Sequence, residues 1–193
     1  ILGCFPTLVH EMSYANINDA KLWYEVSGDG PPLMLHHGFT ASHVNWQPVA
    51  ERLSAHYQII MMECRGTGSS EHTADGYNLE QYAADVVGML DHLGLDKVSF
   101  AGHSMGGGIG YLMGLEHAAR LNNLILMAPI PAAGISELPP QQLIDERLAA
   151  RDRGDRGHFL AEQKAQRFRA DVQTDAWFES RVDHLLGVSE GHL

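Results

Sequence analysis

The feature of the sequence that most restricts its fold is an alternation of short apolar runs with helical patterns between residues 32 and 127. The runs at 32–36, 58–62, 97–101 and 121–127 have the length and apolar character of buried strands. The segments between them repeat apolar side chains at helical spacing. This alternation predicts a doubly wound α/β fold, with a mostly parallel sheet and helices on both faces.

Local signals place further elements around these strands. Residues 13–17 and 22–27 alternate in polarity and predict an N-terminal hairpin that turns at residues 18–19. Asn78 is a suitable N-cap for a helix that ends at Gly94, and residues 46–55 predict another helix. We therefore expect each buried strand to be followed by a covering helix.

The last third of the chain differs from the rest in charge. Residues 1–137 hold 19 charged side chains, and residues 138–193 hold 18 although that segment is less than half as long. Residues 141–151, 158–169 and 174–186 read as polar amphipathic helices. The sequence thus predicts a core domain over 1–137 and a helical segment over 138–193.

Composition excludes several classes of function. Acidic residues outnumber basic ones by 24 to 13, for a net charge of −11, and no basic cluster occurs, so we expect no nucleic-acid or anionic membrane partner. No apolar run reaches the roughly 18–20 residues that span a bilayer. Two cysteines, Cys4 and Cys64, cannot form a disulfide framework, which favours a cytoplasmic protein. The 12 histidines lack metal-site spacing, so we expect no metal and no cofactor.

Residues 102–106 read Gly-His-Ser-Met-Gly and match the pattern Gly-x-Ser-x-Gly. The pattern alone could be an ordinary glycine-rich turn, but here it joins a predicted strand to a predicted helix, as a nucleophile elbow requires. We therefore expect Ser104 to be a catalytic nucleophile on a strained turn. Gly102 and Gly106 would let the neighbouring backbone approach closely.

An oxyanion hole is also predicted. Acyl transfer needs backbone N–H donors directed at the developing oxyanion. Met105, which follows the nucleophile, would give one donor, and Phe39 in the His37-Gly38-Phe39 loop after an earlier strand would give the other. The Phe39 side chain could also serve as an apolar plug, which is compatible because the donor is its backbone.

These motifs resemble the α/β-hydrolase superfamily, and in particular its lid-bearing members. The resemblance runs from about residue 13 to 129 and includes Trp46. It also includes residues 63–70, which are similar to the family's Asp-x-Arg-Gly-x-Gly-x-Ser turn with Glu63 at the acidic position. We expect Glu63 and Arg65 to shape this loop and Cys64 to be buried.

The resemblance implies an activity. A serine at position 104 disfavours the family's dehalogenases and epoxide hydrolases, which have an aspartate there. It suits esterases, lactonases, carbon–carbon bond hydrolases and acyltransferases. Residues 138–193 are similar to the family's lid, and a small to medium hydrophobic acyl substrate is expected. The main hypothesis is a serine hydrolase that acts on a carboxylic ester or a related acyl compound.

The triad partners of the serine are not evident. In this fold an Asp or Glu and then a His follow the serine along the chain, and the resemblance places them beyond the lid. The residues after the strand at 121–127 are Ala-Pro-Ile-Pro, without an acid. His103 is not expected to reach the hydroxyl, and His158, His184 and His192 are expected to face solvent. The last core strands, the triad acid and the triad histidine are therefore expected to lie outside this sequence.

Three interpretations remain open. In the favoured interpretation the chain is a portion of a longer hydrolase, which its start without Met also favours. A second chain could instead supply the missing strands and triad residues. The third interpretation is a short form that binds a ligand or partner without catalysis, although an exposed apolar sheet edge disfavours it. A homo-oligomer is left open by the sequence.

Overall fold

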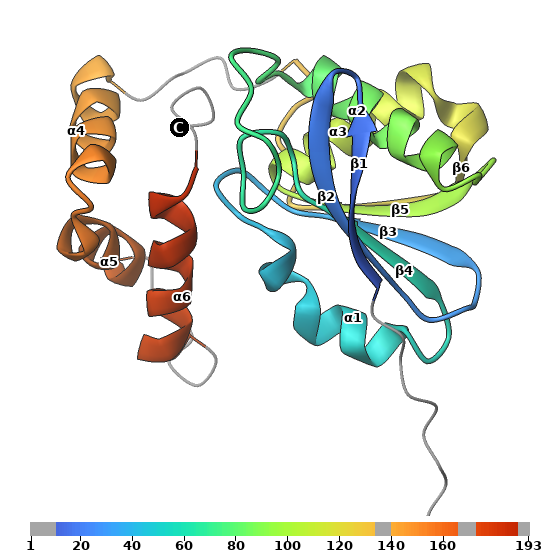
Figure 1. Cartoon of the computed structure of the whole chain (residues 1–193), viewed down its shortest axis with the longest axis horizontal. Helices are drawn as coiled ribbons and strands as arrows, with labels where there is room; N and C mark the ends of the chain where they lie inside the picture. The colour runs from blue at the N-terminus through green and yellow to red at the C-terminus, as the bar shows by residue number, and fades with distance from the viewer. Residues whose placement is uncertain (1–10, 134–139, 166–172, 189–193) are drawn as a thin grey trace, which may run out of the picture.

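A six-stranded sheet forms the centre of the computed structural model, which describes residues 11–133, 140–165 and 173–188 (Figure 1). Its strands are β1 (Glu11–Ile17), β2 (Ala20–Ser27), β3 (Pro32–His36), β4 (Gln58–Met62), β5 (Val98–His103) and β6 (Leu121–Met127), in the order β1-β2-β4-β3-β5-β6. β1 and β2 are antiparallel to their neighbours, and the other four strands are parallel to one another. The predicted α/β fold with an N-terminal hairpin is confirmed.

Helices cover both faces of this sheet (Figure 1). One face carries α1 (Gln47–Leu53), and the other carries α2 (Leu79–His92) and α3 (Met105–Glu116). Two short 3-10 helices, η1 (His43–Asn45) and η2 (Ala118–Arg120), lie in the connections. Along β3, Leu33 and Leu35 pack in the α1 cluster, while Met34 packs in the α2 and α3 cluster. The strand is thus apolar on both sides because both sides are covered.

Local sequence signals account for several boundaries. The Asn78 side chain accepts a hydrogen bond from the Gln81 N–H at 2.8 Å, and Gly94 ends the α2 segment at a φ of 67°. The strand predicted at 97–101 extends further, because Gly102 and His103 pair with Leu126 and Met127 of β6. The helix predicted at 46–55 is shorter, because Trp46 is the N-cap of α1 and Ser54 is its C-cap.

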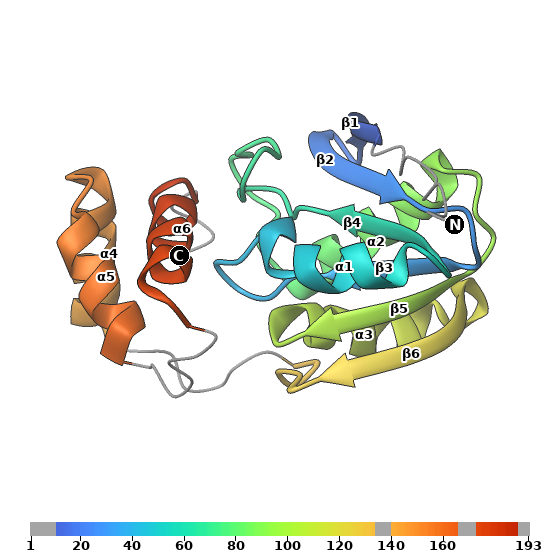
Figure 2. The same ribbon diagram turned by 90° about the horizontal axis from the view of Figure 1, so that it is seen from below.

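Three further helices form a separate layer, called here the C-terminal helices: α4 (Gln141–Asp152), α5 (Arg156–Ala165) and α6 (Asp175–Leu186). They lie off the end of the sheet toward which the parallel strands run (Figure 2). Their own small apolar cluster holds Ala150, Phe159, Val182 and Leu185, all fully buried. The helix predicted over 158–169 starts two residues earlier, and its last four positions lie outside the described residues.

β6 is the edge strand of the described sheet. Its Leu124, Ile125 and Met127 side chains are between 36% and 48% exposed, unlike the buried strands β3 and β4. In the part of the chain that the structure describes, no helix is both long and apolar enough to cross a lipid bilayer.

Candidate active site

Ser104 lies between the end of β5 and the start of α3, on a strained turn. Its φ is 54° and its ψ is −114°, a conformation that costs a non-glycine residue about 1–3 kcal/mol. The turn is fixed on both sides, because the Ser104 N–H donates to the Met127 carbonyl at 3.0 Å and the Ile130 N–H donates to the Ser104 carbonyl at 3.1 Å. The strain is therefore maintained by neighbouring backbone.

Two glycines allow this turn to pack. A Cβ atom on Gly102 would lie 2.1 Å from the Gly106 carbonyl oxygen, and one on Gly106 would lie 2.5 Å from the His36 carbonyl oxygen. Both obstacles are backbone atoms, which cannot move aside as a side chain can. Only glycine fits at either position, so the start of α3 can approach β3 and β5 closely.

The loop after β3 lies against the serine. A Cβ atom on Gly38 would be 3.1 Å from the Ser104 Cβ atom, which shows how near the two backbones are. The His37 ring holds the Gly38 peptide: Nε2 accepts from the Cys64 N–H at 3.1 Å, so Nδ1 carries the proton and donates to the Gly38 carbonyl at 2.8 Å. Phe39, the next residue, is thereby placed beside Ser104.

Met105, the other predicted oxyanion donor, is the first residue of α3 and is buried. The first N–H groups of a helix have no acceptor within the helix and point out of its N-terminus. The Gly107 and Gly108 N–H groups, one turn further, bond to the Ser104 carbonyl at 2.9 and 3.1 Å. The structure thus brings Ser104, Met105 and the Phe39 loop together at one end of the sheet.

Glu63 follows β4, and its carboxylate holds together two neighbouring segments of the described chain. Its Oε1 atom lies 2.7 Å from His43 Nδ1, and its Oε2 atom accepts the Ser69 N–H at 2.6 Å. The His43 ring stacks on Trp23, with 4.1 Å between the ring centres. Glu63 therefore connects the 63–70 loop with η1, in agreement with a loop-shaping role.

Arg65 forms a buried ion pair with Asp85 of α2. Its Nε and Nη2 atoms donate to the two carboxylate oxygens at 2.9 and 2.8 Å, and the Asp85 carboxylate raises the pKa of the guanidinium despite its burial. The Asn18 amide and the Gln81 amide also donate to Asp85 Oδ1. This network joins the 63–70 loop, the hairpin turn and α2.

Cys64 and His36 are buried side by side and are poorly suited to catalysis. Burial raises the pKa of the Cys64 thiol well above its ordinary value, which disfavours the reactive thiolate. Burial lowers the pKa of His36 from 6.5 to about 4, so this imidazole is neutral at pH 7. The prediction that Cys64 is buried is confirmed.

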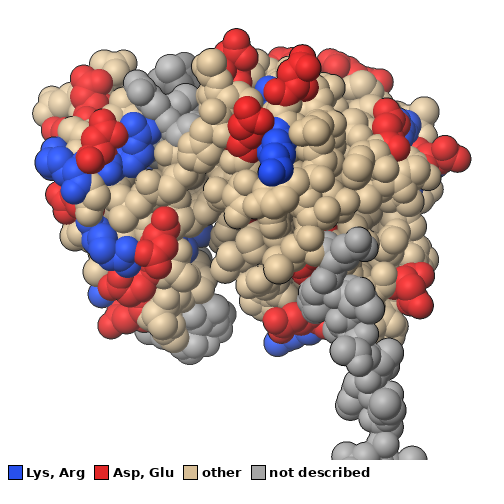
Figure 3. Space-filling model, in the orientation of Figure 1, with Lys and Arg blue, Asp and Glu red and all other residues tan. Residues whose placement is uncertain are grey.

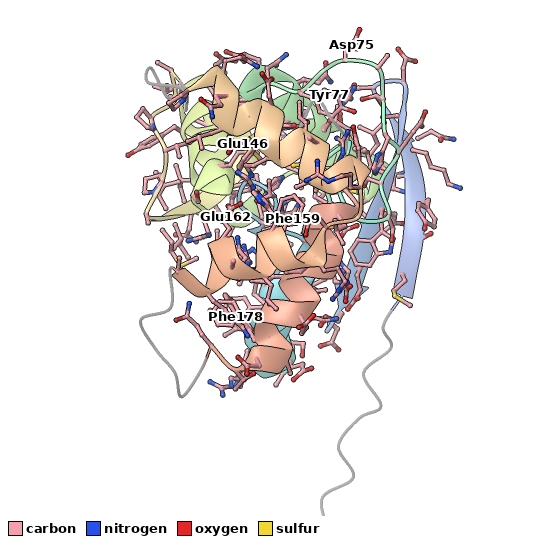
Figure 4. All side chains as sticks on the ribbon, turned by 90° about the vertical axis from the view of Figure 1, so that its left-hand side faces the viewer. Asp75, Tyr77, Glu146, Phe159, Glu162 and Phe178 are labelled. Carbon is pink, nitrogen blue, oxygen red and sulfur yellow. The ribbon has the colours of Figure 1, made fainter. Side chains whose placement is uncertain are left out.

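A cavity of about 560 Å³ opens over the serine, between the end of the sheet and the C-terminal helices. The sheet side is formed by the 37–41 loop, α1 and the elbow, and the helical side by polar residues of α4, α5 and α6. Its lining includes Phe39, Trp46, Val49, His103, Ser104, Met127, Arg147, Glu162, Gln163 and Arg181. Figure 4 looks onto the C-terminal helices from outside, with Phe159 and Glu162 of α5 in front of the sheet region. The cavity can hold a small molecule in contact with Ser104.

The prediction that His184 faces solvent is wrong. The residue is half-buried, its backbone partner is Ala41 in the loop after β3, and burial is the main cause of its lowered pKa. Its Nε2 atom is buried without a hydrogen-bond partner. His158 is also half-buried, and its ring lies edge-on to that of Phe159. His192 lies outside the described residues.

No histidine of the described ranges hydrogen-bonds to the Ser104 hydroxyl. His103, the residue before the serine, lines the same cavity but makes no hydrogen bond to that hydroxyl. Sequence reasoning missed Asp85, His43 and the cavity residues of the C-terminal helices. The one available signal was the spacing of Trp177 and Arg181, one helical turn apart, which indicates that these two residues share a face of α6.

Comparison with known proteins gives one consistent family. The model of the alpha/beta hydrolase fold matches residues 31–181. The chain is 32% identical over 117 residues to a soluble epoxide hydrolase of Corynebacterium sp. strain C12, covering 61% of this chain and 41% of that protein. It is 35% identical over 114 residues to 2-hydroxymuconate semialdehyde hydrolase of Pseudomonas sp. strain CF600, covering 57% and 39%.

A solved structure shows the same fold. The enol-lactonase of Burkholderia xenovorans LB400 superimposes with a TM-score of 0.77 at 22% identity, covering 93% of this chain and 70% of that one. In the sequence matches, the chain spans about two fifths of the length of its curated relatives.

Proposed function

Because the chain belongs to the α/β-hydrolase family, we propose that it is part of a serine hydrolase that cleaves a carboxylic ester or related acyl substrate through an acyl-enzyme on Ser104. The observation that carries this proposal is the strained Ser104 turn, which faces a cavity large enough for a small substrate. The relatives named above are hydrolases of the same fold. An aspartate-based attack on an epoxide is disfavoured, because position 104 is a serine.

The chemistry would follow the geometry of the elbow. The Ser104 Oγ atom attacks the substrate carbonyl carbon while its proton passes to a base, and the new oxyanion accepts hydrogen bonds from the Met105 and Phe39 N–H groups. Collapse of this intermediate expels the alcohol, which takes the proton. Water then attacks the acyl-enzyme in the same way and releases the acid. The chain supplies the nucleophile and the oxyanion donors.

The base and its carboxylate are proposed to come from polypeptide outside this chain. Within the described residues no histidine reaches the Ser104 hydroxyl, and serine is a weak nucleophile without such a base. The relatives are also much longer than the part that this chain matches. A continuation of the same polypeptide is favoured over a second chain, because a single fold then supplies the whole triad.

The C-terminal helices are proposed to act as a lid over the acyl pocket, with the core over residues 1–137 and the lid over 138–193. This lid role is supported by the cavity lining, to which α4, α5 and α6 all contribute. The resemblance to a carbon–carbon hydrolase supports a second candidate, in which the same serine acts on a dione. Comparing turnover of esters with turnover of vinylogous diones separates the two.

The test is turnover of p-nitrophenyl butyrate by the complete polypeptide. Ser104→Ala should lower kcat by about 10³-fold or more, as removal of a serine nucleophile does in other hydrolases. Ser69→Ala, which changes an exposed serine near the same end of the sheet, is the matched control. Equal turnover by the Ser104→Ala protein and the unmodified protein would contradict the proposal.

A further inference from the structure

Arg181 of α6 lines the Ser104 cavity and has no acidic partner among the residues that the structure describes. Its Nε atom donates to the Gln163 side-chain carbonyl at 3.0 Å, and its guanidinium carbon lies 5.1 Å from the centre of the Trp177 ring. Both partners are neutral. Among the described residues, no carboxylate forms an ion pair with it, and burial alone accounts for the lowering of its pKa.

The other described arginines of the C-terminal helices differ from it. Arg147, which lines the same cavity, has Glu162 at 3.5 Å as its partner. Arg151, Arg153 and Arg156 each pair with one or more carboxylates outside the cavity. Arg181 is therefore an exception among the described arginines of these helices, because each of the others pairs with an acid.

The charge of Arg181 also reaches the elbow. Burial lowers the pKa of His103, the residue next to Ser104, and the positive charge of Arg181 lowers it further. The remaining charged lining residues, Arg147 and Glu162, offset each other. Among the lining residues that the structure describes, the cavity wall opposite the serine thus carries one uncompensated positive charge.

A half-buried guanidinium without a counter-charge is costly for a protein to maintain. Its planar donors match a carboxylate, and a partner that arrives with the ligand would restore the balance. A phosphate monoester carries nearly two charges and would need a second unpaired cation, but Arg147 is already paired with Glu162. One carboxylate is the anion that fits one free guanidinium.

We propose that Arg181 binds a carboxylate on the substrate. The substrate is then held at two ends, with the scissile acyl group over Ser104 and the carboxylate at the Arg181 guanidinium. The assignment of the reacting end rests on the proposed function; the anion site rests on Arg181 alone. The substrates are then half-esters or related acyl compounds with a remote carboxylate. This changes the expected purely hydrophobic acyl group to one that is hydrophobic along its length and anionic at its end.

The test compares two esters of equal length in the complete polypeptide: mono-p-nitrophenyl adipate, with a terminal carboxylate, and p-nitrophenyl hexanoate, without one. The ratio of kcat/KM for adipate over hexanoate should fall about 30-fold or more in Arg181→Gln, as expected for loss of a desolvated charge pair. It should fall less in Arg181→Lys, which keeps the charge but not the planar fork. Arg153→Gln, outside the cavity, should leave the ratio unchanged.

A ratio that stays the same in Arg181→Gln overturns the anion site even if Ser104 proves to be the nucleophile. If neither ester is turned over, the proposed function fails, and binding decides the anion site. Calorimetry of monomethyl adipate with the Ser104→Ala protein should then show binding that Arg181→Gln weakens about 30-fold. Equal binding to both proteins, or no binding to either, overturns the inference.

Discussion

The sheet region (residues 11–133) and the C-terminal helices are stabilised in different ways. The sheet region has an apolar cluster on each face and buries charged groups inside it, such as Arg65 and Asp85. The C-terminal helices share a cluster of four buried residues and carry ion pairs at their surface, such as those of Arg156 with Glu179 and Asp183. Figure 3 shows acidic and basic side chains interspersed over these helices, while the charged groups on the sheet region beside them are separated by broader uncharged areas.

This difference indicates that the two regions contribute to the site in different ways. The sheet region fixes the Ser104 turn through backbone contacts that tolerate almost no change. The C-terminal helices contribute the opposite cavity wall through long polar side chains, whose identity can change without altering the elbow. We infer that the reaction type is set by the first region and substrate choice by the second.

The largest expected effect on stability distinguishes the apolar core of the sheet region from that of the C-terminal helices. Phe100 and Phe159 are both fully buried, one in each region. Replacing either with Ala should cost about 4 kcal/mol of local stability. Hydrogen exchange should show the loss from Phe100→Ala throughout the sheet, but the loss from Phe159→Ala only in α5 and α6. Equal loss of protection in β3 and β5 for both variants would mean that the two regions unfold together.

The next effect separates buried from exposed ion pairs. Arg65→Met leaves the buried Asp85 carboxylate without its guanidinium partner and should lower the free energy of unfolding by about 3 kcal/mol. Arg156→Met removes surface pairs with Glu179 and Asp183 and should change the urea midpoint little. A similar shift of the midpoint in both variants would contradict the contrast between the regions.

A smaller effect follows from pH. The buried His36 has a pKa of about 4 in the folded protein against 6.5 when unperturbed. Between these values the unfolded chain binds a proton that the folded protein does not, so stability falls as pH decreases from 6.5 to about 4. The expected slope is about 1.4 kcal/mol per pH unit from this group.

Urea unfolding at pH 7 and pH 5 measures that slope. His36→Gln should remove the contribution, whereas His56→Gln, which changes an exposed histidine, should retain it. An unchanged pH dependence in His36→Gln would show that this ring does not set the acid sensitivity of the sheet region.

Much of the sheet region could be predicted because its signals are local. The strand–serine–helix turn depends on Gly102 and Gly106, and the pattern of their spacing is visible in the sequence. The pairing of Arg65 with Asp85 was not predictable, since it depends on where α2 packs, 20 residues later. The burial of His184 and the position of Arg181 depend on how α6 docks over the loop after β3. A helical pattern does not encode that docking.

The most direct test of the central claim is covalent labelling of the complete polypeptide with a fluorophosphonate, followed by mass mapping of the adduct. The account predicts one adduct per chain on Ser104, and none in the Ser104→Ala protein. An adduct on another residue, or ester hydrolysis that continues while Ser104 stays unlabelled, would contradict the assignment of Ser104 as the nucleophile.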